Sequence, residues 1–131
     1  MKINHSKLKS LAKKYRLALL VMFGSQASSQ AQAESDIDLA FYAFEKVDEE
    51  KLYQELIHLL QRADIDLVNL ATSHNHILRF EILHKGILLY EKEEGIKSRM
   101  EWQSYMDYID FMPYYAVRST LLEKKLAEMA A

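Results

Sequence analysis

The chain has 131 residues, of which 50% are hydrophobic and 27% charged, the balance of one globular domain with its own core. Its 17 basic and 19 acidic residues leave a formal net charge of -2, which argues against extended, non-specific nucleic-acid binding. The sequence contains no cysteine, so disulfides, zinc–thiolate sites and cysteine nucleophiles are excluded.

The first segment predicts neither a signal peptide nor a membrane anchor. Its apolar run, LALLVMF at 17–23, is shorter than a signal-peptide core, and no small-residue cleavage site follows it. No stretch approaches the roughly 20 apolar residues of a membrane span. We therefore expect a cytoplasmic protein.

Hydrophobic periodicity predicts helices that alternate with strands. In chain order the expected elements are helix 6–15, strand 17–23, strand 36–43, helix 48–61, strand 65–70, helix 73–85 and strand 87–91. Asp48 is expected to cap the second helix, and Gly86 to end the third in a left-handed conformation. The strand at 17–23 is apolar throughout, which is typical of a strand buried on both faces. The pattern indicates an α/β or α+β sheet domain.

A long helical extension is expected from about Ile96, with an interruption near Pro113. Aromatic residues recur in it every three positions, at Trp102, Tyr105, Tyr108, Phe111 and Tyr114. A helix turns every 3.6 residues, so this row winds around the helix and cannot all face one small domain. The helix could still pack on its own domain, but we favour a partner-binding surface, because such rings anchor interfaces.

Two aspartates open the strand expected at 36–43. Asp36 and Asp38 lie two residues apart, so they share one face of the strand, with Cα atoms ~6.5 Å apart. At an effective dielectric near 20 their repulsion is on the order of 2–3 kcal/mol, and no basic residue within the motif offsets it. Carboxylates together with substrate phosphates are the ligands that Mg²⁺ favours, so a metal site is expected here.

Gly24 and Ser25 form a turn after the first strand, and ten residues separate this turn from Asp36. Glycine lets backbone N–H groups approach a phosphate closely, and the serine hydroxyl is a further donor. A helix beginning after Ser25 would direct its positive end at the same anion. The turn therefore predicts a phosphate site beside the metal site.

A third aspartate, Asp66, stands on the strand expected at 65–70. If this strand pairs with the second one, Asp66 reaches the same metal site, whereas Asp64 sits at the strand's mouth and is expected to be an exposed cap. Three converging carboxylates suit two-metal phosphoryl or nucleotidyl transfer. In that reaction Asp66 would also accept the proton of the nucleophile.

Residues 17–91 resemble the polymerase-beta superfamily of nucleotidyltransferases, in particular its minimal nucleotidyltransferase domain. The family signature is Gly-Ser, ten residues, Asp-x-Asp and a third aspartate on a later strand. The residues at those positions are Gly24, Ser25, Asp36, Asp38 and Asp66. The segment LRFEILHKGILLYE at 78–91 also looks like the stretch that follows the third aspartate in the family.

The resemblance implies a polymerase-beta-like fold, a mixed sheet flanked by helices, in residues 1–95, followed by a helical tail in 96–131. It also implies ATP as nucleotide donor, with two Mg²⁺ ions held by the three aspartates and the phosphates held at the Gly-Ser turn. Many small members adenylylate a tyrosine of a HEPN ribonuclease toxin and thereby act as its antitoxin. By the same resemblance, the tail would contact such a toxin.

One departure from the family leaves alternatives open. Gln26 stands where the family commonly has Arg or Tyr, and losing that arginine removes a triphosphate contact of about 1.5–3 kcal/mol. The chain could thus neutralise a partner by binding alone. Whether it forms a homo-oligomer or a hetero-oligomer is left open by the sequence. Nucleotidylation of a small molecule such as an aminoglycoside is a third possibility, although such enzymes usually carry a further substrate-binding domain.

Three histidines and an arginine outside the signature have simpler interpretations. His74 and His76 in the HNH run lie on different faces of a helix start, so we interpret the run as helix-entry polarity, not a metal or nuclease site. Arg79 and His84 are expected to be solvent-exposed, with contact to nucleotide or partner as the alternative.

Overall fold

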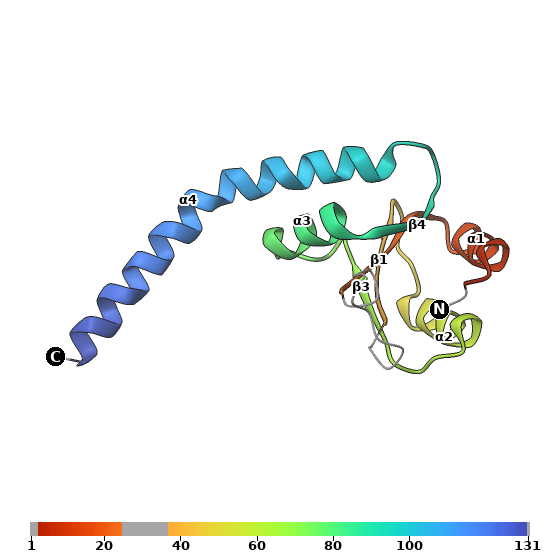
Figure 1. The fold of residues 1–131 in the computed structure, drawn as a ribbon, viewed down its shortest axis with the longest axis horizontal. Coiled ribbons are helices and arrows are strands. Elements are labelled where there is room, and N and C mark those ends of the chain that lie inside the picture. Colours follow the sequence, from red (N-terminus) through yellow and green to blue (C-terminus); the bar gives the residue numbers. More distant parts are fainter. Residues whose placement is uncertain (1–2, 25–36, 131) are drawn as a thin grey trace.

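A computed structural model of the chain describes residues 3–24 and 37–130, apart from the side chains of Tyr115 and Ala130. Its centre is a four-stranded sheet (Figure 1) in the order β3-β2-β1-β4. The strands are β1 (Leu17–Phe23), β2 (Ile37–Ala43), β3 (Ile65–Asn69) and β4 (Ile87–Glu91). β1 is antiparallel to both of its neighbours, whereas β2 and β3 are parallel. The mixed sheet confirms the expected α+β fold class.

Helices cover both faces of this sheet. They are α1 (His5–Lys14), α2 (Glu49–Leu60), α3 (His76–Lys85) and α4 (Ile96–Ala130). One face packs on α1 and α2 through Leu8, Leu52 and Leu56, and the other packs on α3 and the start of α4 through Ile82, Leu83 and Ile96. β1 supplies buried side chains to both cores, which confirms that its apolar run is buried on both sides.

A small polar cluster joins the C-terminal end of α1 to the middle of α2. The Tyr15 hydroxyl donates to Glu55, and Lys14 Nζ donates to the other Glu55 oxygen at 2.8 Å. The hydrogen bond to Glu55, with burial and nearby negative charge, raises the pKa of Tyr15 to about 12. The same hydrogen bonds lower the pKa of Glu55.

This cluster predicts a loss of stability at alkaline pH. Because the folded-state pKa of Tyr15 lies above its unfolded value of about 10, its stabilisation is complete below pH ~10 and is lost as pH rises through about 12. Absorbance titration of tyrosinate should show one late-titrating tyrosine, absent in Tyr15→Phe and titrating earlier in Glu55→Gln. If the wild type and Tyr15→Phe lost the same amount of stability over this range, the coupling to Glu55 would be refuted.

Two features of α3 differ from the sequence expectation. The helix begins at His76, not Ser73, because the Asn75 side chain caps it and accepts a hydrogen bond from the Leu78 N–H at 3.0 Å. Gly86 is extended, with φ -68°, and is therefore not left-handed. Glycine is needed there for space, since a Cβ would lie 2.3 Å from the Ile82 carbonyl oxygen where α3 returns to the sheet.

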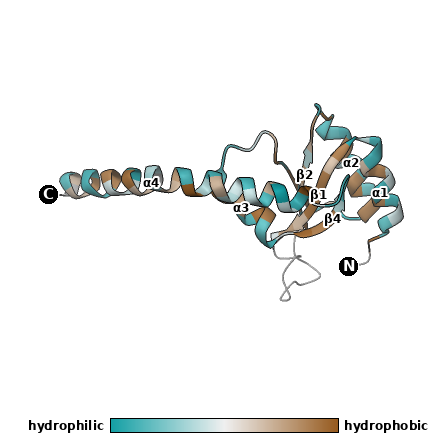
Figure 2. Ribbon diagram, turned by 90° about the horizontal axis from the view of Figure 1, so that it is seen from above, coloured by the Kyte–Doolittle hydropathy of each residue, from teal (hydrophilic) through white to brown (hydrophobic). Residues whose placement is uncertain are grey.

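α4 is one continuous helix, which corrects the expected interruption near Pro113. Proline removes one backbone hydrogen bond and crowds the preceding turn, and such a residue bends a helix without having to end it. Figure 1 shows α4 lying along α3 and then changing direction as it projects from the sheet domain. The projecting part carries both apolar and polar residues (Figure 2). No helix in the described ranges is long and apolar enough to cross a bilayer.

Candidate functional site

Asp38 stands in the second position of β2, on the sheet face that packs on α3 and α4. Its neighbours Ile37 and Leu39 point into the opposite core, while Ala40 belongs to the α3–α4 core, as the alternation of a strand requires. The Asp38 side chain is half-buried. It pairs in register with Phe23 at the end of β1.

Asp66 is the register partner of Asp38 on the neighbouring parallel strand β3. Register partners of parallel strands present their side chains on the same face, and adjacent strands lie ~4.8 Å apart. The strand pairing on which the expected convergence depended is therefore present. Asp66 is exposed, and no residue in the described part of the chain forms a hydrogen bond or ion pair with it.

Asp64, two residues earlier, is in a different environment. Arg62 holds it with two hydrogen bonds, one of them from Nε at 2.8 Å, and these lower the pKa of the Asp64 carboxyl. The Asp64 carbonyl also accepts a hydrogen bond from the Ile37 N–H at 2.9 Å. Asp64 is thus a structural residue at the start of β3, partly exposed as expected, and its charge is already paired.

Gly24 lies directly against the Asp38 carboxylate. A Cβ on Gly24 would stand 2.1 Å from Asp38 Oδ2, and the residue adopts φ +75°, which side chains disfavour. Only glycine leaves room for this carboxylate at the end of β1. The sequence assigned Gly24 to a phosphate turn and gave no sign of this contact, because the pairing of Phe23 with Asp38 joins segments that are not adjacent in the sequence.

Two expected site residues, Ser25 and Asp36, lie outside the described residues. Within 3–24 and 37–130 no three His, Asp or Glu residues gather as a metal cluster. The described part of the site is therefore Gly24, Asp38 and Asp66.

This arrangement fits a divalent cation. The Asp38 and Asp66 carboxylates, at adjacent register positions, repel each other. The repulsion is on the order of 1 kcal/mol at the dielectric constant of water and about 3 kcal/mol at that of a protein surface. Asp66 meets no lysine or arginine among the described residues. Carboxylate oxygens of this kind suit Mg²⁺, which binds through one or two carboxylates together with phosphate oxygens.

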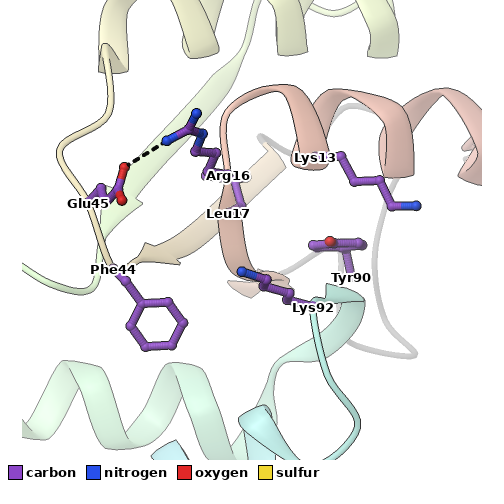
Figure 3. Close-up of a pocket in the computed structure, with 7 residues that line it drawn as sticks. All are labelled: Lys13, Arg16, Leu17, Phe44, Glu45, Tyr90 and Lys92. Atoms are coloured by element: carbon purple, nitrogen blue, oxygen red, sulfur yellow. Dashed lines mark hydrogen bonds and ion pairs between the residues drawn. The ribbon is translucent and has the colours of Figure 1, made fainter.

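Figure 3 shows a cavity of about 480 Å³ whose lining residues do not include these aspartates. It surrounds Leu17, which pairs with Ala43 at the opposite end of β1 from Phe23. Its cations are Lys13, Arg16 and Lys92, and Arg16 is bonded to Glu45 at 3.2 Å. Because the cavity lies at the other end of β1, it cannot take part in the chemistry of Asp38 and Asp66.

The polar residues of α3 contribute to packing more than expected. His76 stacks on Phe111 of α4 with ring centroids 4.1 Å apart, and His84 Nδ1 lies 2.7 Å from a Glu101 oxygen. The capping role of Asn75 confirms the helix-entry interpretation of the HNH run. Arg79 is only partly exposed and its Nε is buried, contrary to the expectation of simple solvent exposure. No hydrophobic periodicity in the sequence predicts the partial burial of Arg79.

The sequence profile of one family, "Polymerase beta, Nucleotidyltransferase", matches residues 6–95. The chain belongs to this nucleotidyltransferase family. The match spans β1 to β4 and so includes Gly24, Asp38 and Asp66. Among curated proteins, none matches the chain.

Solved structures show the same nucleotidyltransferase fold over nearly the whole chain. A toxin–antitoxin structure with AMP-PNP is similar with a TM-score of 0.74 and 23% identity, over 95% of this chain and 99% of that one. A complex of tri-AMPylated Shewanella oneidensis HEPN toxin with MNT antitoxin has a TM-score of 0.68 and 23% identity, over 94% and 96% of the two chains. Because the coverage is this high, the long helix α4 belongs to the shared fold.

Proposed function

We propose that this chain transfers AMP from ATP to a tyrosine hydroxyl of a HEPN-type toxin and thereby acts as its antitoxin. The observation that carries the proposal is the register pair Asp38–Asp66 beside Gly24 in a member of a nucleotidyltransferase family. The similar structures support the choice of nucleotide and acceptor, since one contains AMP-PNP and another an AMPylated HEPN toxin.

In the proposed reaction Asp36, Asp38 and Asp66 would hold two Mg²⁺ ions, which would supply positive charge to the reacting phosphate groups. Asp66 accepts the proton of the tyrosine hydroxyl as its oxygen bonds to the α-phosphorus. The bond from the α-phosphorus to the bridging oxygen breaks, and pyrophosphate leaves with that electron pair. Gly24 keeps the Asp38 carboxylate in place, and Ser25 donates to a phosphate oxygen.

The direct experiment combines the full chain with Mg²⁺, labelled ATP and a HEPN-type protein from an adjacent reading frame. We expect label on the partner with the wild type and none with Asp38→Ala. If Asp38→Ala neutralised the partner equally well and the wild type transferred no label, the enzymatic proposal would fall.

A second candidate function, neutralisation by contact, is favoured by the exposed surface of α4. Its projecting half presents an apolar set that no other described element covers, here called the tail face: Val117, Leu121, Leu122, Leu126 and Met129. These side chains are 56–74% exposed. An apolar surface of this kind is typical of a partner interface.

The tail face predicts where the partner binds. Leu122→Asp with Leu126→Asp should weaken the complex by about 2 kcal/mol or more, because buried apolar anchors carry most interface energy. Glu123→Ala, on the polar side of the same helix, is the matched control and should bind as the wild type. Calorimetry measures both affinities, and circular dichroism checks the helix. An unchanged affinity in the double variant would place the interface elsewhere.

A further inference from the structure

A second cavity, of about 410 Å³, lies where β2 ends against α3 and α4. Its volume falls within the range of small-molecule sites. Tyr42 lines it from the same sheet face as Asp38, four residues further along β2, which places the two Cα atoms ~13 Å apart. The cavity is therefore separate from the carboxylate pair.

Two arginines face this cavity, Arg79 from α3 and Arg99 from α4. Neither forms an ion pair or hydrogen bond through its side chain with any residue in the described ranges, and the Arg79 Nε is buried without an acceptor. Buried donors without partners are rare in folded proteins, so the Arg79 Nε is expected to meet an acceptor from outside the chain.

Two aromatic rings line the cavity beside these guanidinium groups. Phe44 is 68% exposed although it is a large apolar side chain, and it meets the Tyr42 ring edge to face at 5.5 Å. Phe44 also lines the cavity drawn in Figure 3, where its ring points away from the Arg16–Glu45 pair. An exposed ring held in this way is a platform on which a planar group can stack.

Charge and shape together define the ligand class. Guanidinium groups bind phosphate and carboxylate through paired hydrogen bonds, and two of them match the double charge of a phosphate monoester better than a single carboxylate. We propose that this cavity, the Arg79–Arg99 site, binds a nucleoside monophosphate. The phosphate pairs with the two arginines, and the base stacks on Phe44.

The test uses the full chain without metal and with AMP as ligand, so that it is independent of AMP transfer. Calorimetry should detect AMP binding, and Arg79→Ala and Arg99→Gln should each weaken it at least tenfold. Ribose 5-phosphate, which keeps the phosphate but lacks the base, should bind at least fivefold more weakly than AMP. Arg118→Ala, which removes an exposed arginine from the projecting half of α4, should bind AMP as the wild type.

Backbone amide shifts locate the ligand. AMP should shift the signals of Arg79 and Arg99 and leave those of Asp38 and Asp66 in place. The proposal is overturned if AMP does not bind, if Arg99→Gln binds as tightly as the wild type, if ribose 5-phosphate binds equally well, or if the shifts gather at the aspartates. Asp38→Ala should keep this binding while losing label transfer, so failure of one proposal is distinguishable from failure of the other.

Discussion

Asp66→Asn should reduce the proposed AMP transfer by at least about a hundredfold, because it removes both a metal ligand and the proton acceptor. Asp66 faces Asp38 across the β2–β3 pair and has no ion-pair partner among the described residues. Initial rates of label transfer at saturating Mg²⁺ and ATP measure the effect. A variant with near wild-type rates would remove Asp66 from the mechanism.

Asp64→Asn is the matched control for this experiment. It makes the same chemical change two residues earlier on the same segment, but the Asp64 carboxylate is bonded to Arg62 and not to the site. Transfer should therefore stay close to the wild-type rate. Equal losses in both variants would indicate general damage to β3 instead of a specific role for Asp66.

Gly24→Ala should reduce transfer by about a hundredfold, since displacement of a reacting group by about 1 Å costs this much. The new Cβ would stand 2.1 Å from Asp38 Oδ2, so the carboxylate or the turn must move. The left-handed φ of +75° adds strain of roughly 1–2 kcal/mol. Label transfer and thermal unfolding should be measured on the same preparation.

Gly95→Ala is the control that separates the effect of backbone strain from the effect of displacing the Asp38 carboxylate. Gly95 also has a positive φ, +97°, but a Cβ there meets no atom within 4 Å. This variant should lose stability by on the order of 1–3 kcal/mol, while its transfer rate below the unfolding transition stays unchanged. If Gly24→Ala transferred AMP as fast as Gly95→Ala, the contact with Asp38 would have no catalytic consequence.

The expected elements match the structure where local patterns are strong. The apolar run at 17–23 is β1, and Asp48 caps α2 with its side chain accepting from the Lys51 N–H. Boundaries were less predictable, because α3 begins at the Asn75 cap and not at Ser73. Pro113 was expected to interrupt the last helix, yet the helix continues through it. The hydrogen bond lost at Pro113 costs less free energy than the helical turns on either side of it contribute.

The aromatic row of α4 shows why packing could not be read from spacing. Tyr105 and Tyr108 contact Phe80 of α3, and Phe111 stacks on His76, so part of the row packs within the chain. Trp102 and Tyr114 remain 65% and 59% exposed. A row that winds around the helix meets α3 on one side only, so packing on the chain's own domain accounts for part of the row, and partner binding by the exposed part stays a prediction.

By itself the sequence determined the family resemblance, the order of strands and helices, and the acidic residues of the candidate site, because spacing and periodicity are local properties of the chain. Only the tertiary structure distinguished Asp66 from Asp64, placed Gly24 against the Asp38 carboxylate, and brought Arg79 and Arg99 to one cavity. Each of these depends on strand register or helix packing between distant segments. Such contacts are decided by the burial and pairing of the whole fold, which no local pattern records.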